Sequence, residues 1–200
     1  MDTKENILNE AKREFLEKGF EKASLRNIVK NVGMTTGAFY GYFKSKEILF
    51  EAIVGEPARV VMDGFNQRQL DFQQIPDDQQ LARMGVDSGE WMSEMSDYIL
   101  EHSDEFKLII TKSQGTKYEH YIHEMAKVES EATQHFIDVL KRQGYQLPRI
   151  DEHLSHLLIS GFFSSYFEIV VHDMPRDEVQ DYIIQLNAFY HAGWSKIMGL

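Results

Sequence analysis

The spacing of apolar residues is the feature of this sequence that most restricts its fold. Apolar side chains recur at intervals of three and four residues along almost the whole chain, and no run alternates with a period of two. The first spacing places apolar side chains on one face of an α-helix, whereas a half-buried strand would need the second. The sequence therefore predicts an all-α protein in which most helices bury one apolar stripe.

Capping residues divide the first fifty residues into three short helices and the start of a fourth. A first apolar stripe is followed by Gly19, a residue suited to the left-handed position that ends a helix. Ser24 and Thr35 are N-cap residues for a second and a third helix, and Gly33 lies in the tight turn between those two helices. Ser45 caps the fourth helix. This order of helix, tight turn and short helix is typical of a helix-turn-helix.

Longer helices are predicted after Pro57. We expect Gly and Pro residues to mark the breaks between them, and residues 72–78 to form a loop. Asp151 is an N-cap residue, and Pro175 stands where a helix begins. The expected helical segments are 91–100, 103–112, 118–142, 151–172 and 175–198.

The charge of the chain is divided unevenly along its length. The formal net charge is -11 at pH 7, which by itself disfavours binding to nucleic acid. Residues 1–50, however, carry a small net positive charge, and the remainder of the chain is strongly acidic. If any part of this chain approaches a phosphate backbone, we expect it to be the first fifty residues.

Several classes of protein are disfavoured by what the sequence lacks. It has no cysteine, hence no disulfide framework, thiolate nucleophile or zinc-finger ligation, in keeping with a reducing compartment. Its start is polar, and we find no run approaching the roughly 20 apolar residues of a membrane span, so we expect a cytoplasmic protein with no membrane partner. Gly-rich phosphate loops and the GxSxG and HExxH motifs are absent too, so we expect neither an enzyme nor a cofactor.

The segment 25–49, LRNIVKNVGMTTGAFYGYFKSKEIL, resembles the signature of the TetR family of transcriptional regulators. The turn glycine, Tyr40, Phe43 and Lys46 agree with the family pattern in order and spacing. A recognition helix also needs small or polar residues at its N-terminal end and a bulky apolar back face, and the segment supplies both. Two residues depart from the pattern: Val29 replaces a small residue, and Gly41 weakens a short helix by about 1 kcal/mol relative to Ala.

The resemblance implies a helix-turn-helix DNA-binding domain at residues 1–47, followed at 48–200 by a helical domain for effector binding and dimerisation. Arg26 is expected to reach a base edge or a phosphate, and the N-terminal end of the recognition helix to face base edges. Tyrosine and lysine side chains that follow are expected to contact phosphates. The candidate DNA-binding residues are Arg26, Thr35, Thr36, Gly37, Ala38, Tyr40, Tyr42, Lys44 and Lys46.

The resemblance also implies a homodimer and a small-molecule effector. The last two predicted helices carry wide apolar faces that would form the dimer interface. The interface candidates are Leu154, Leu158, Gly161, Phe162, Ser165, Ile169, Leu186, Phe189 and Tyr190. A pocket needs an apolar lining with a few polar groups. The effector-binding candidates are Trp91, Met95, Tyr98, Phe106, Ser113, Tyr121, Met125, His135, Phe163, Tyr166 and Phe167.

These expectations describe a repressor that binds a palindromic, double-stranded DNA operator as a dimer and is released by its effector. One alternative is a metal-sensing regulator of the same fold, because His120 and His123, and likewise His153 and His156, have the i, i+3 spacing that can hold zinc on a helix. A second is a helical interaction protein that has lost DNA binding. A third keeps DNA binding but activates transcription.

Overall fold

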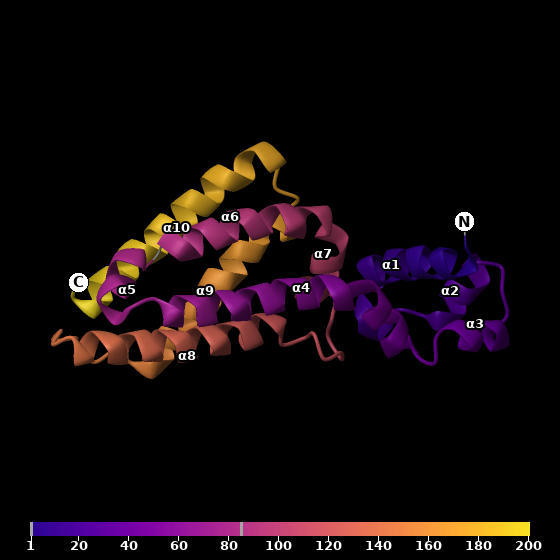
Figure 1. Ribbon diagram of the computed structural model, residues 1–200. Helices are drawn as coiled ribbons and strands as arrows, with labels where there is room; N and C mark the ends of the chain where they lie inside the picture. Colours follow the sequence, from indigo (N-terminus) through magenta and orange to yellow (C-terminus); the bar gives the residue numbers. More distant parts are fainter. Residues whose placement is uncertain (1, 85) are drawn as a thin grey trace. The chain divides into compact units, whose positions relative to one another are not determined.

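The computed structural model describes residues 2–84 and 86–200, and within them every regular element is a helix (Figure 1). The all-α prediction is therefore confirmed. By packing, the chain divides into a first unit, Met1–Val60 with His102–Tyr121, and a second unit, Val61–Glu101 with Ile122–Leu200. The helices are α1 (Thr3–Lys22), α2 (Leu25–Asn31), α3 (Thr36–Tyr42), α4 (Lys46–Gln74), α5 (Asp77–Arg83), α6 (Val86–Glu101), α7 (Ser103–Thr111), α8 (Tyr121–Arg142), α9 (Glu152–Val171) and α10 (Arg176–Met198).

The first unit is built around phenylalanine rings of α1 and α4. The rings of Phe15 and Phe50 meet edge to face with centroids 5.2 Å apart, and Phe20 meets Phe50 in the same way at 5.3 Å. Helix α7 closes the unit against α1, where the Lys12 ammonium lies 2.5 Å from the Glu105 carboxylate. The domain boundary predicted between residues 47 and 48 did not include α7, because α7 is distant in sequence. Whether the DNA-binding domain ends at that boundary stays a prediction.

Gly19 interrupts α1 at the expected place, but it does not adopt the left-handed helical conformation that was predicted, and α1 continues beyond it to Lys22. Its φ is +75° and its ψ is 162°, a combination essentially restricted to glycine. The bend lets the backbone N–H of Phe20 leave the helix and donate to the carbonyl of Lys112 at 2.8 Å. The glycine therefore directs the end of α1 onto the segment that follows α7.

Helix α4 continues through Pro57, a residue that we expected to mark a break. Proline cannot donate the helical hydrogen bond, so the carbonyl of Ile53 loses its partner within the helix. The cost is offset because Ile53, Ala58 and Val61 are all buried, and packing of an apolar face contributes more to a helix than one hydrogen bond. As a result, α4 contributes residues to both units.

The loop expected at residues 72–78 is shorter in the structure, because α4 extends to Gln74 and α5 begins at Asp77. The sequence analysis did not predict α5. It is polar, and its buried residue is Gln80, whose side-chain amide donates to the carbonyl of Ile75 at 2.9 Å. With one buried polar residue and no apolar stripe, a seven-residue helix leaves no periodic signal to detect.

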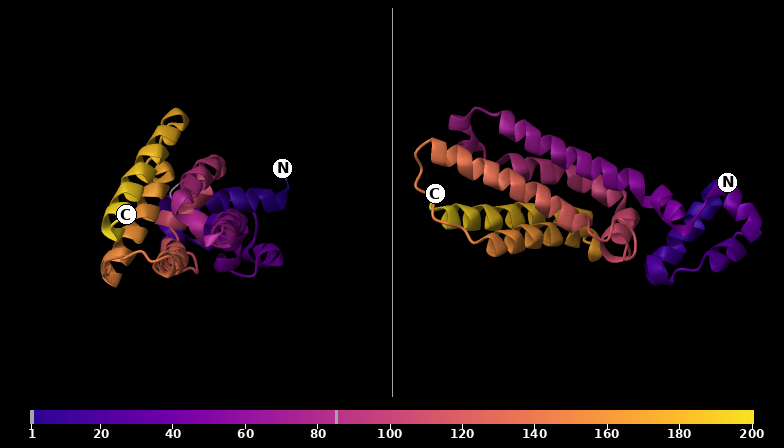
Figure 2. Two further views of the ribbon diagram at one scale, coloured as in Figure 1. Left: turned by 60° about the vertical axis from the view of Figure 1, so that its left-hand side comes forward. Right: turned by 90° about the horizontal axis from the view of Figure 1, so that it is seen from below.

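The second unit packs α6, α8, α9 and α10 with the C-terminal part of α4 (Figures 1 and 2). Helix α8 runs beside α4, where the rings of Phe72 and Phe136 meet edge to face with centroids 5.8 Å apart. The completely buried Tyr166 of α9 donates its hydroxyl to the carbonyl of Met92 at 2.9 Å and so joins α9 to α6. Residues of these helices line the cavity described below.

Helix α9 is long and apolar enough to span a membrane by length and composition alone, which the sequence analysis had not recognised. Its inner face carries Phe163 and Phe167, both buried in the second unit. Its outer face carries Leu154 and Leu157, which are 44% and 67% exposed. Helix α9 is therefore apolar on a buried face and on an exposed face.

Glu14 is a buried carboxylate that joins α1 to the start of α2. It accepts the Lys18 ammonium at 2.9 Å and the backbone N–H of Ser24 at 3.1 Å. Burial raises its pKa, but the hydrogen bonds from Lys18 and Ser24 and the Lys18 charge outweigh that effect, so the net pKa is lowered. The ionised form therefore stabilises the first unit.

We expect Glu14→Gln to lower the free energy of unfolding by about 2 kcal/mol at pH 7, because charge-assisted hydrogen bonds are lost at a buried site. Since the folded-state pKa lies below the unfolded value of about 4.5, the difference from the wild type should be complete above that pH and shrink as the pH falls below it, through the folded-state pKa. Urea unfolding followed by circular dichroism measures both. The exposed Glu17→Gln on the same helix is the control, with a change near zero. An equal loss at every pH would contradict the charge-based account.

Candidate DNA-binding surface and ligand cavity

The turn between α2 and α3 is fixed by two capping hydrogen bonds. The Ser24 hydroxyl accepts the backbone N–H of Asn27 at 3.4 Å, and the Thr35 hydroxyl accepts that of Ala38 at 3.2 Å. Between the helices, Gly33 has a φ of +71°, in the left-handed region that favours glycine. Both predicted N-caps and the turn glycine are confirmed.

The inner face of α3 is apolar and fully covered. Phe39 has no exposed surface, Phe43 is 3% exposed, and their ring centroids lie 6.0 Å apart. On α2, Ile28 and Val29 are also buried, so Val29 is accommodated in the core although it departs from the family pattern. Burial of these side chains fixes the angle at which α3 is held.

The outer face of α3 is open. Tyr40 and Tyr42 are 44% and 46% exposed, and a Cβ added at Gly37 or Gly41 would meet nothing within 4 Å. The Lys44 ammonium donates to the carbonyl of Tyr40 at 3.1 Å, at the C-terminal end of the helix. Eight of the nine predicted DNA-binding residues are exposed: Arg26, Thr35, Thr36, Gly37, Ala38, Tyr40, Tyr42 and Lys44.

Lys46, the ninth, is held differently. Its ammonium donates to the backbone carbonyls of Phe20, Glu21 and Ala23 at 2.7, 3.2 and 3.3 Å. It also lies 4.5 Å from the centre of the Phe20 ring. A cation at this place satisfies carbonyls that the end of α1 leaves unpaired. Lys46 is therefore a positioning residue that ties α4 to α1, and its phosphate contact stays a prediction.

We expect Lys46→Met to destabilise the first unit by about 1 kcal/mol, because carbonyls at the end of α1 lose their charged donor. Lys44→Met is the control, because Lys44 lies two residues before Lys46 and its ammonium contacts a single carbonyl. It should lower the stability much less than Lys46→Met does. The midpoint of urea unfolding compares the two. Equal stability of Lys46→Met and the wild type would show that the three carbonyl contacts contribute nothing.

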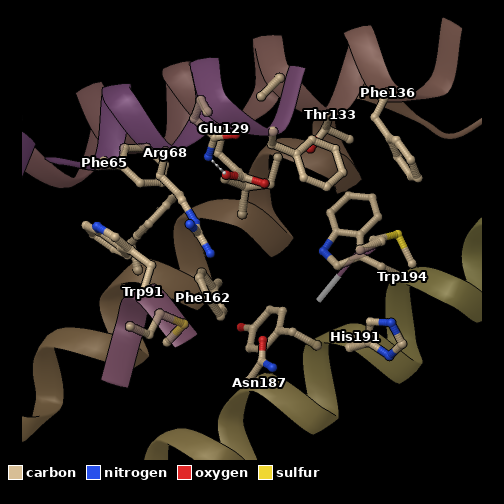
Figure 3. A pocket seen from close by; sticks show the side chains of 18 of the residues that line it. Phe65, Arg68, Trp91, Glu129, Thr133, Phe136, Phe162, Asn187, His191 and Trp194 are labelled. Atoms are coloured by element: carbon tan, nitrogen blue, oxygen red, sulfur yellow. Dashed lines mark hydrogen bonds between the residues drawn. The ribbon is translucent and has the colours of Figure 1, made fainter. Parts of the chain in front are cut away.

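The second unit contains a cavity of about 170 Å³ (Figure 3). Two kinds of side chain line it, aromatic rings and polar groups. The rings come from α4, α6, α8, α9 and α10, and several meet edge to face, such as Phe65 with Phe163 at 5.3 Å between centroids. The aromatic lining residues are Phe65, Phe72, Trp91, Phe136, Phe162, Phe163, Tyr190 and Trp194.

Three helices contribute to the lining with one common pattern. Each presents residues at i, i+3, i+4 and i+7, the spacing of a single helix face. In each stripe, polar residues interrupt an otherwise apolar or aromatic face. The three stripes are Phe65, Arg68, Gln69 and Phe72 on α4; Glu129, Ala132, Thr133 and Phe136 on α8; and Asn187, Tyr190, His191 and Trp194 on α10.

Two ionisable side chains, Arg68 of α4 and Glu129 of α8, reach the cavity (Figure 3). The Glu129 carboxylate accepts the side-chain amide of Gln69 at 2.7 Å. Burial raises the pKa of Glu129, and hydrogen bonds from Gln69 and Thr133 oppose that shift only in part. The guanidinium of Arg68 lies 3.7 Å from the Glu90 carboxylate. The cavity thus offers a donor and an acceptor within an aromatic lining.

The sequence analysis identified few of the cavity residues. Of its eleven effector candidates, Trp91 and Phe163 line the cavity. The hydroxyls of Ser113, Tyr121 and Tyr166 donate to backbone carbonyls, so these side chains serve packing. The other six also lie outside the lining: Phe106, Met125 and Phe167 are buried, Met95 and Tyr98 are half-buried, and His135 is exposed.

The residues that were missed, among them Arg68 and Glu129, do leave a signal in the sequence. They are polar residues inside stripes that are otherwise apolar. Candidates had been sought mainly among aromatic and methionine side chains, which are also the commonest core residues of such a domain. A search for polar interruptions would have pointed to the cavity.

The outer face of α9 and α10 is apolar and exposed. Leu154 and Phe189, both predicted interface residues, are 44% and 73% exposed. Leu157 and Ile184, which were not among the interface candidates, are 67% and 64% exposed. Ile169 is a correction, because it is completely buried within its own unit. The remaining interface candidates, Leu158, Gly161, Phe162, Ser165, Leu186 and Tyr190, are half-buried.

The histidines do not pair as their spacing predicts. His123 of α8 meets His156 of α9 with ring centroids 5.5 Å apart. His120 lies 3.1 Å from the Glu119 carboxylate, and His153 lies 3.7 Å from that of Asp151. Among the residues that the structure describes, no three His, Asp or Glu side chains converge as a metal site would require.

Residues 7–53 match the sequence profile of the family described as "Bacterial regulatory proteins, tetR family". The HTH-type transcriptional repressor Rv1474c of Mycobacterium tuberculosis is 40% identical over 50 residues, which make up 25% of this chain and 27% of that protein. The chain thus matches about a quarter of the length of this curated relative. The similarity in sequence falls on the helix-turn-helix.

The similarity in structure covers nearly the whole chain. A regulatory protein of the tetR family from Rhodococcus RHA1 gives a TM-score of 0.59 at 18% identity, covering 99% of this chain and 97% of that one. The regulator FadR from Bacillus subtilis, solved in complex with stearoyl-CoA, gives 0.50 at 16% identity and covers 94% and 98% of the two chains. At these identities the likeness concerns the fold.

Proposed function

We propose that this chain, which belongs to the TetR family of bacterial regulatory proteins, is a cytoplasmic repressor that binds a palindromic operator as a homodimer and releases it when a small molecule fills the cavity. The observation that carries this proposal is the capped helix-turn-helix, whose outer face is open while its inner face is buried. Regulators of this family are DNA-binding proteins and not enzymes.

The proposed DNA contacts follow from the exposed face of α2 and α3. Thr36, Gly37 and Ala38 would face base edges at the N-terminal end of the recognition helix, and Arg26 would read a guanine or bind a phosphate. Tyr40, Tyr42 and Lys44 would contact phosphates, as would Lys46 if it shares its ammonium with the end of α1. The small positive charge of residues 1–50 supports this side of an acidic protein as the one that meets DNA.

A homodimer through α9 and α10 is supported by their exposed apolar face. Leu157 and Phe189 each expose about two thirds of their surface or more, which is costly in water for side chains of this size. A twofold interface would bury these side chains against the same apolar face of the partner, and the two recognition helices would then read two half-sites about one turn of DNA apart.

Release by an effector is supported by the composition of α4. The same helix begins with Lys46, which holds the end of α1, and later carries Phe65, Arg68 and Phe72 of the cavity lining. A molecule that fits one conformation of the cavity would shift the population of α4 conformations and lower operator affinity. The stearoyl-CoA bound by FadR is a precedent for a ligand-bound protein of this fold.

Selection from a random duplex library with the purified protein should yield an inverted repeat, because a twofold dimer presents two identical recognition helices. Binding to that duplex should weaken steeply with salt, and Lys44→Gln should reduce the salt slope by about one. Arg26→Ala should cost about tenfold in affinity. His135→Ala, an exposed change on α8, is the control. Selection of no sequence by a folded protein would refute operator binding.

We expect Phe189→Glu to convert the dimer to a monomer, because two buried carboxylates would face the twofold axis without a cation. Light scattering after size-exclusion chromatography measures the mass. Leu70→Glu is the matched control, since Leu70 is 52% exposed on α4 and lies outside the proposed interface. A Phe189→Glu protein that stays dimeric would place the interface elsewhere.

A further inference from the structure

The size of the cavity limits its occupant. At about 170 Å³ it is smaller than the 300–1,000 Å³ typical of sites for drug-sized ligands. One or two fused rings match a compact space of this kind better than a long acyl chain. The occupant is therefore expected to be a small molecule.

The cavity wall favours a flat aromatic occupant. Rings from five helices line it, and they already meet one another edge to face, as Phe65 does with Phe163 and Phe162 does with Tyr190 at 5.0 Å between centroids. A ring has a negative face and a positive edge, so an added aromatic ring can pair its edge with the face of a lining ring, or its face with the edge of one. Trp91 of α6 and Trp194 of α10 offer further rings on two opposite sides of the space (Figure 3).

The charges at the cavity disfavour an ion of either sign. A cationic occupant would meet the Arg68 guanidinium, and an anionic one would have to compete for that guanidinium with the Glu90 carboxylate, which lies 3.7 Å from it. Arg83 adds a second cation to the lining, but its side chain is exposed to solvent. A neutral group that both accepts and donates a hydrogen bond satisfies Arg68 and Glu129 together.

We propose that the cavity takes a neutral, planar aromatic molecule whose hydroxyl group accepts a hydrogen bond from Arg68 and donates one to Glu129. A phenol has this chemistry and is neutral at pH 7. This inference rests on the proposed function only for its consequence on DNA, because the binding itself concerns the second unit alone.

Three naphthalene compounds of similar size test the assignment. They are 2-naphthol, which is neutral, naphthalene-2-carboxylate, which is an anion, and naphthalen-2-ylmethylammonium, which is a cation. Isothermal titration calorimetry at pH 7 should give the tightest binding for 2-naphthol, by at least tenfold over either ion. Tighter binding of either ion, or no binding of all three, would overturn the proposal.

Variants locate the hydroxyl group. Arg68→Met and Glu129→Gln should each weaken 2-naphthol binding at least fivefold and narrow its advantage over the ions, whereas the exposed His135→Ala on α8 should not. A variant that merely unfolded would lose its helical circular dichroism, which is recorded for each. If both folded variants bind 2-naphthol as the wild type does, the proposed hydrogen bonds are wrong.

The position of the ligand has its own readout. The chain has two tryptophans, Trp91 and Trp194, and both line the cavity. Binding of 2-naphthol should therefore change their fluorescence, and Trp194→Phe should remove part of that change; binding without any change would overturn the assigned site.

Operator binding is measured on the same protein. If the ligand fails to bind while DNA binding is intact, this inference is refuted and operator recognition is unaffected.

Discussion

The recognition helix depends on the burial of two phenylalanine side chains. Helix α3 has seven residues and two glycines, so it has little stability of its own. It is held because Phe39 and Phe43 are buried and because Thr35 caps its first turn. The same burial leaves the opposite face to solvent, and the proposed contact with a base edge requires this division between a fixed inner face and an open outer face.

The second constraint concerns α4, which takes part in the core of one unit and the cavity of the other. Lys46 at its start satisfies carbonyls at the end of α1, while Arg68 near its end reaches the cavity. Pro57 weakens the helix between these positions by one hydrogen bond, and packing keeps it continuous. The proposed release by a ligand depends on this helix, because it carries residues of both units.

The sequence predicted the fold and the N-terminal motif better than it predicted the cavity. Caps such as Ser24, Thr35 and Asp151 act within a few residues, so their effect can be read locally, and all three accept the expected backbone N–H groups. The cavity depends on which faces of distant helices meet, and periodicity does not specify that. Tyr166 and Trp91 have the same chemical character, yet one is packed in the core and the other lines the cavity.

The central claim is that filling the cavity and binding the operator oppose each other, and linkage gives it a direct test. The affinity of the wild-type protein for a cavity ligand is measured by calorimetry, alone and in the presence of saturating operator duplex. Thermodynamic reciprocity requires the operator to weaken ligand binding by the same factor by which the ligand weakens operator binding. We predict a decrease of about tenfold or more. An equal ligand affinity in both conditions would contradict the account.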